Sequence, residues 1–100
     1  MTKPHRSHDE ATAELLREDP ALAAEYLDAV LEDGDQAEVL IALRHIVNAR
    51  SSIQKVAEQT ELNATTLYRT LSPTGNPELR SLMKVLGAVG LRLSIEPVRA

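Results

Sequence analysis

Apolar residues return every three or four positions through most of the chain, and this spacing predicts a helical protein. A first stripe starts at Asp19 and Pro20, which are typical of an N-cap and a first helical position. It ends at Gly34, where we expect the left-handed conformation that closes many helices. A second stripe starts at Asp35, with Glu38 three positions later as its partner in a capping box. The pattern therefore predicts two amphipathic helices in succession.

Residues 51–71 have the pattern of two short helices joined by a tight turn. The run Ser51-Ser52-Ile53-Gln54 predicts a capping box at the start of the first helix. Glu61-Leu62-Asn63 interrupts the pattern, and Asn63 is suited to cap a second helix with Leu67 and Leu71 on its inner side. A connection of about three residues is typical of the DNA-binding helix-turn-helix, whose second helix enters the major groove.

The two ends of the chain differ from this helical middle. Residues 1–18 hold few apolar side chains, so we predict a partly mobile N-terminal extension followed by a domain over residues 19–96. After a final helix that closes at Gly90, the residues Leu91, Leu93 and Ile95 alternate with polar ones, as in a β-strand. A single strand has no ladder partner in its own chain. The sequence therefore predicts a strand that pairs across a homodimer, with a disordered tail as the alternative.

Composition limits the classes of function that remain. A chain of 100 residues, 43% of them hydrophobic, suits one small domain with a real core. It has no Cys, no histidine–carboxylate spacing typical of a metal site and no nucleophile or phosphate-loop motif. We therefore expect no enzyme activity, cofactor or bound metal. No apolar run approaches the roughly 20 residues that span a bilayer, and the N-terminus lacks a signal-peptide core, so a cytoplasmic protein without membrane contact is predicted.

The net charge of −4 conceals two oppositely charged halves. Residues 1–38 contain three basic and eleven acidic side chains, a balance of −8, whereas residues 39–100 contain eight basic and four acidic ones, a balance of +4. A basic half suits nucleic acid and an acidic half suits a basic protein partner. The alternative is that both sets of charges are ordinary solvated helix faces.

Candidate DNA contacts lie along and around the second short helix. Hydroxyl and guanidinium groups there are suited to base edges, while the start of the preceding helix and the loop after residue 71 offer groups for phosphates. The predicted contact residues are Ser51, Ser52, Gln54, Lys55, Ala64, Thr65, Thr66, Tyr68, Arg69, Thr74 and Asn76. The helix holds a single basic residue, so one subunit should bind weakly, and a two-fold dimer would double the contacts on half-sites about 34 Å apart. A three-helix core that binds only protein is the alternative.

Three segments of the chain resemble one known family, the HigA-like addiction-module antidote proteins. They are Asp19-Pro20-Ala21-Leu22-Ala23-Ala24-Glu25-Tyr26-Leu27 to Glu32-Asp33-Gly34-Asp35, Leu67-Tyr68-Arg69-Thr70-Leu71-Ser72-Pro73-Thr74-Gly75-Asn76-Pro77, and Leu82-Met83-Lys84-Val85-Leu86-Gly87-Ala88-Val89-Gly90-Leu91-Arg92-Leu93. The apolar pattern predicts an all-α fold of five to six short helices with a central helix-turn-helix and one C-terminal strand. The resemblance implies that this helical domain is phage-repressor-like.

The same resemblance implies an antitoxin that neutralises a small basic toxin of the RelE/ParE-like superfamily and represses its own operator as a dimer. The chain departs from the family at two positions. It has Glu61 where the family often has Gly, and Ala64 where the family often has Arg near the start of the recognition helix. Two other functions stay open from the residues: a stand-alone transcriptional regulator without a toxin, and a protein-interaction module whose DNA surface has decayed.

Overall fold

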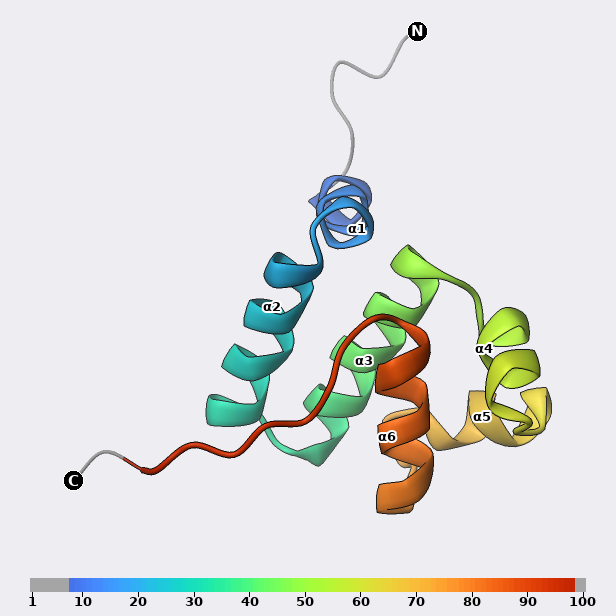
Figure 1. The fold of residues 1–100 in the computed structure, drawn as a ribbon. Helices are drawn as coiled ribbons and strands as arrows, with labels where there is room; N and C mark the ends of the chain where they lie inside the picture. The colour runs from blue at the N-terminus through green and yellow to red at the C-terminus, as the bar shows by residue number, and fades with distance from the viewer. Residues whose placement is uncertain (1–7, 99–100) are drawn as a thin grey trace, which may run out of the picture.

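Six helices make up the regular structure of the part of the chain that the structure describes. The computed structural model describes residues 8–98, and its helices are α1 (His8–Glu18), α2 (Pro20–Asp33), α3 (Gln36–Arg50), α4 (Ile53–Thr60), α5 (Ala64–Thr70) and α6 (Leu79–Ala88). Figure 1 shows α1, α2 and α3 gathered at one end and α4 and α5 at the other. The helical part of the fold prediction is confirmed, and the division of the chain after residue 18 stays a prediction.

The starts of α2 and α3 follow directly from their first residues. A carboxylate oxygen of Asp19 accepts hydrogen bonds from the amides of Ala21 and Leu22 at 3.0 and 3.2 Å, and Pro20 occupies the first turn. At the start of α3, Asp35 and Glu38 form the predicted capping box, with bonds of 2.9 and 3.1 Å. These bonds satisfy amides that have no partner within the helix.

The end of α2 corrects one expectation. Gly34 has a φ of −90° and extended backbone, so it is not the left-handed residue that the sequence suggested. The chain passes straight into the cap of α3, and an extended residue suits that path. A Cβ at Gly34 would lie 2.7 Å from the carbonyl oxygen of Val30, so lack of space, and not a positive φ, favours glycine here.

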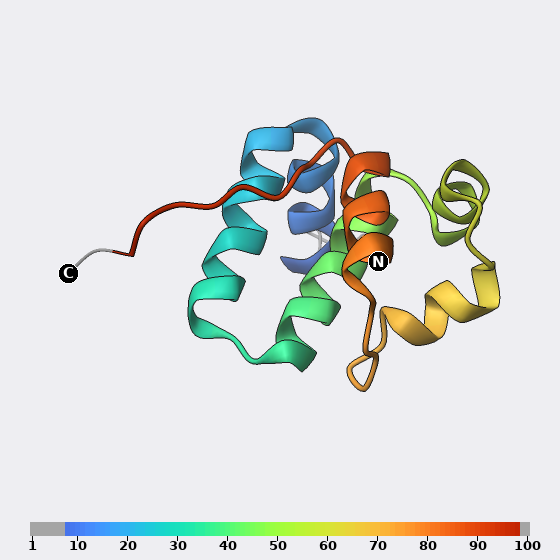
Figure 2. The same cartoon turned by 60° about the horizontal axis from the view of Figure 1, so that its bottom comes forward.

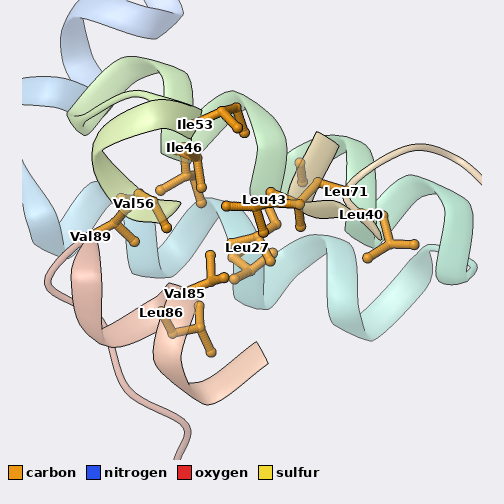
Figure 3. Close-up of a cluster of buried hydrophobic side chains, with 14 of the residues drawn as sticks. Leu27, Leu40, Leu43, Ile46, Ile53, Val56, Leu71, Val85, Leu86 and Val89 are labelled. Atoms are coloured by element: carbon orange, nitrogen blue, oxygen red, sulfur yellow. The ribbon is translucent and has the colours of Figure 1, made fainter. Parts of the chain in front are cut away.

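The hydrophobic core surrounds α3, which packs against α1, α2 and α4 (Figure 2). Its side chains Leu43, Ile46 and Val47 are completely buried. Figure 3 shows Leu43 and Ile46 among apolar side chains from α2, α4 and α6, and the buried members of this cluster are all aliphatic. The buried members are Leu16, Ala23, Leu27, Leu40, Ala42, Leu43, Ile46, Val47, Ile53, Val56, Ala57, Leu67, Leu71, Val85, Leu86 and Val89. One core therefore fixes the two ends of the molecule relative to each other.

Arg50, at the end of α3, joins three parts of the chain. Its Nε donates to the carbonyl oxygen of Val89 at 2.7 Å, just after α6. One terminal nitrogen donates to the carbonyl oxygens of Leu16 and Arg17, at 3.0 and 3.1 Å, in the last turn of α1. A cation near the last carbonyls of a helix is favourable, because those groups lack partners within the helix and carry the negative end of its dipole.

The predicted C-terminal strand is absent from residues 8–98, which contain no β-structure. Residues 91–98 are nevertheless extended, and the red segment in Figures 1 and 2 leaves α6 and runs past α2. Leu91, Leu93 and residues between them line a groove with α2, whereas Ile95 is 98% exposed. A strand is defined by hydrogen bonds to a second extended segment, and no other described part of this chain is extended beside it.

Among the residues that the structure describes, no helix is long and apolar enough to cross a membrane.

Candidate nucleic-acid interface

The N-cap of α4 lies one residue later in the chain than the sequence suggested. Ser52 is the N-cap, and its hydroxyl oxygen accepts a hydrogen bond from the amide of Lys55 at 3.1 Å. The capping box predicted for Ser51 and Gln54 is wrong, because Lys55 occupies the third helical position and a lysine side chain has no acceptor to return the bond. Gln54 and Lys55 are both exposed at the first turn of α4.

The turn between α4 and α5 consists of residues 61–63 and is stabilised by local hydrogen bonds. Glu61 has φ 61° and ψ 25°, the left-handed conformation that ends many helices. This geometry lets the amide of Leu62 donate to the carbonyl oxygen of Ala57 at 3.0 Å. Asn63 then caps α5, as predicted, by accepting from the amide of Thr66 at 3.1 Å. The tight connection is therefore held by a backbone bond at the end of α4 and by a side-chain cap at the start of α5.

The short helix α5 has one buried side and one exposed side. Leu67 and Leu71 are buried, as predicted, and with residues of α3 and α6 they line a mostly apolar pocket of about 100 Å³ that is partly open to solvent. Thr65, Thr66, Tyr68 and Arg69 are exposed, and Ala64 is half-buried. The helix therefore presents hydroxyl, phenol and guanidinium groups to solvent on a surface fixed by the core.

The loop that follows α5 is fastened to it and to α3. The hydroxyl of Ser72 donates to the carbonyl oxygen of Arg69 at 2.7 Å, and the amide of Gly75 donates to the carbonyl of Ser72 at 2.9 Å. From α3, the side-chain amide of Gln36 donates to the carbonyl oxygen of Gly75 at 3.0 Å. Thr74 and Asn76 are exposed on this loop. Two of the predicted phosphate contacts are thus held beside the end of α5.

Of the eleven predicted contact residues, the structure places four at the start of α4, five on α5 and two on the following loop. Ser51 and Ser52 are half-buried, whereas Gln54 and Lys55 are open to solvent. The three residues predicted for dimerisation lie on the extended segment after α6, with Leu91 half-buried and Leu93 and Ile95 exposed. The assignment of these residues to DNA or to a dimer stays a prediction.

Two residues of α3 that sequence reasoning missed border this surface. The guanidinium carbon of Arg44 lies 5.3 Å from the centre of the Tyr68 ring, and Gln36 holds the loop through Gly75. Gln36, Leu40 and Arg44 are four residues apart, which places them on one side of the helix. The sequence shows this spacing, but it does not show which helix the shared side of α3 faces.

The surface is built for hydrogen bonding and charge contact. Among the described residues, no group of three histidine, aspartate or glutamate side chains is close enough to hold a metal ion. The exposed side of α5 and its loop offers neutral donors and acceptors with Arg69, and the half-buried Arg44 of α3 lies beside them. Such a set suits an extended anion with hydrogen-bonding edges.

Comparison with known proteins gives one family and one relative. Residues 7–97 match the family model described as "Probable addiction module antidote protein". An uncharacterised protein of Haemophilus influenzae (strain Rd) is 34% identical over 74 residues, which cover 74% of this chain and 75% of that protein. No solved structure matches.

Proposed function

Because the chain belongs to the family of probable addiction module antidote proteins, we propose that it is the antitoxin of a type II toxin–antitoxin module. In this proposal it binds and neutralises a small basic toxin of the RelE/ParE-like superfamily, and as a dimer it represses its own operon through a phage-repressor-like helix-turn-helix. The observation that carries the proposal is the family match, which extends over residues 7–97 and so includes all six helices.

The acidic helix α2 supports a basic toxin as the protein partner. Its fourteen residues include four acidic side chains and no basic one. Glu25, Asp28 and Glu32 are exposed and recur at positions that share one side of the helix. Complementary charge accelerates the encounter between two proteins and excludes partners of like charge. The toxin is therefore expected to meet the α2 side of the molecule, away from α5.

The α4–α5 unit supports DNA as the second partner. Two short helices joined by residues 61–63 have the connection typical of a helix-turn-helix, and α5 exposes Thr65, Thr66, Tyr68 and Arg69. With α5 in the major groove, these side chains would meet base edges, while Lys55 and the loop at Thr74 would meet the flanking phosphates. Each subunit offers only a few positive charges to DNA, so firm binding requires two paired subunits.

The extended segment after α6 supports that pairing. Leu93 and Ile95 are exposed apolar side chains on a stretch that has the alternation of a strand. Antiparallel pairing with the same segment of a second copy would satisfy both backbones and cover these side chains. A homodimer joined through Leu91, Leu93 and Ile95 is the arrangement we propose. A molar mass of a single chain at micromolar concentration in solution would contradict it.

Co-expression with the product of the adjacent gene tests the antitoxin role. We expect the toxin alone to stop growth, and the two proteins together to restore growth and to purify as a complex. A variant with Glu25→Lys and Asp28→Lys should lose most of this rescue, whereas Glu58→Lys, a single charge reversal on α4, should keep it. The antitoxin role is refuted if the unaltered chain neither restores growth nor forms a complex with the toxin.

The chain's own promoter fragment tests the DNA-binding role. We expect binding whose logarithmic affinity falls with the logarithm of the salt concentration, because phosphate contacts release counterions. Arg69→Ala should weaken it. Binding without any neighbouring toxin gene would favour a stand-alone regulator. Toxin binding without promoter binding would favour the protein-interaction module, to which Ala64 and the single basic residue of α5 point.

A further inference from the structure

We propose that Arg44 of α3, held over the ring of Tyr68, is a phosphate-binding residue of the DNA surface. The inference rests on the proposed DNA-binding function and adds a third element to it, since α3 lies outside the two-helix motif. It begins from one contact: the guanidinium carbon of Arg44 lies 5.3 Å from the centre of the Tyr68 ring, across a separation of 24 positions in the chain.

The position of Arg44 follows from how α3 lies beside α5 and its loop. Gln36, at the start of α3, is bonded to the loop at Gly75. One turn later Leu40 is buried, and Figure 3 shows it beside Leu71, which follows α5. Arg44 is the next residue on this side and reaches Tyr68 in the middle of α5. The same side of α3 therefore contacts both the loop and the exposed part of α5.

The charge of Arg44 is available to a ligand. Within residues 11–98, whose side chains are described, no hydrogen bond or ion pair engages its guanidinium, and its contact is the aromatic ring. An aromatic face attracts a cation but does not neutralise it, and the planar group keeps its N–H edges free. Tyr68 is 46% exposed, so the pair lies at the surface. The stacked ring limits the motion of a long side chain before any ligand arrives.

A phosphate, and not a base, fits this placement. If α5 enters the major groove, Thr65, Thr66 and Arg69 on α5 itself are nearest to the base edges, and a side chain from α3 approaches from the flank. The sugar–phosphate backbone forms that flank. The guanidinium fork matches two oxygens of a phosphate, and a preorganised fork loses little conformational freedom on binding. Arg44 would double the number of arginines that one subunit brings to this surface, alongside Arg69.

The test measures DNA affinity of the full chain across salt concentrations, on the promoter fragment and on an unrelated duplex. Arg44→Gln should lower affinity about tenfold at low salt on both duplexes. It should also reduce the slope of log affinity against log salt by about one unit per subunit. Arg44→Lys should keep the slope. Arg17→Gln, which removes an exposed arginine from α1, is the matched control and should change neither quantity.

The role of the ring is tested by measuring the Arg44→Gln effect in two further backgrounds. In Tyr68→Phe the stacking face remains, so the full loss is expected. In Tyr68→Leu the face is gone, so the loss should shrink, because the two side chains act as a unit. Each variant is checked for an unchanged thermal midpoint and helix content.

Three results would overturn the proposal about Arg44 while leaving DNA binding intact: an unchanged salt slope in Arg44→Gln, a loss confined to the promoter sequence, or equal losses in both Tyr68 backgrounds. A chain that binds neither duplex would instead refute the DNA-binding function together with this inference.

Discussion

Glu61 has a backbone conformation that favours glycine, so Glu61→Gly is expected to stabilise the protein. Among the described residues it is the sole non-glycine residue with a positive φ, at 61°. Its side chain is exposed, and no hydrogen bond or ion pair of that side chain is present in the described part of the chain. The substitution therefore removes a strained residue without removing a bond.

The size of the effect follows from two opposing terms. An L-residue in the left-handed region costs about 1–2 kcal/mol relative to its ordinary conformation. Part of this gain, about 0.5–1 kcal/mol, is offset because glycine makes the unfolded chain more flexible and so raises the entropy cost of folding. The net gain in the free energy of unfolding is about 0.5–1 kcal/mol. For a chain of 100 residues this corresponds to a rise of roughly 3–6 °C in the midpoint of thermal unfolding.

The assay compares three variants by thermal and urea unfolding. Glu58→Gly is the matched control: the same change three positions earlier, at an exposed helical residue of α4, should lower stability by about 1 kcal/mol. Glu61→Ala removes the same carboxylate but retains a Cβ, and it should leave stability within about 0.5 kcal/mol of the original. The reasoning is refuted if Glu61→Gly destabilises the protein, or if Glu61→Ala stabilises it as much as Glu61→Gly does. The second result would mean that charge, and not backbone strain, limits stability.

Substitutions at three further positions test the core, the loop after α5 and the cap of α5 by urea unfolding. Leu43→Ala, at a completely buried position of α3, should cost about 2–5 kcal/mol, and a loss below 1 kcal/mol would mean that the core is not centred there. Gly75→Ala would place a Cβ 1.9 Å from the carbonyl oxygen of Thr70, so the loop must move, at a cost of about 1–3 kcal/mol. Asn63→Ala removes the bond to the amide of Thr66 and should cost about 1 kcal/mol, whereas Asn63→Asp should keep most of the stability; equal losses would contradict the cap.

Much of the helical architecture was predictable because its causes are local. Asp19, Asp35 and Asn63 bond to amides two or three positions away, so the capping residues mark where helices begin. The expectations that failed were those for which the same local sequence is compatible with more than one cap or backbone conformation. Ser51 and Ser52 both lie where a cap of α4 is possible, and the structure uses Ser52, although Gln54 offered Ser51 a partner for a capping box. Gly34 matched a left-handed end, but the immediate start of α3 favoured an extended residue.

The candidate DNA surface was only partly accessible from the sequence. The exposed residues of α5 follow from the positions of Leu67 and Leu71, because helical spacing fixes the opposite side. The position of Arg44 at this surface could not be predicted, because its partner Tyr68 is far along the chain and no local rule pairs the two residues. The extended segment after α6 shows the converse case. Its alternation favours a strand, but a strand forms only where a second backbone supplies hydrogen bonds.

The sequence by itself determined the order of the helices after residue 18, the caps of α2, α3 and α5, the short turn at residues 61–63 and the buried side of α5. These depend on interactions between residues at most a few positions apart. The tertiary structure alone decided which sides meet: Gln36 with the loop at Gly75, Arg44 with Tyr68, and Arg50 with the ends of α1 and α6. Those contacts join residues 24 to 39 positions apart. They exist because burial of one aliphatic core around α3 brings helices together in a single arrangement that periodicity cannot specify.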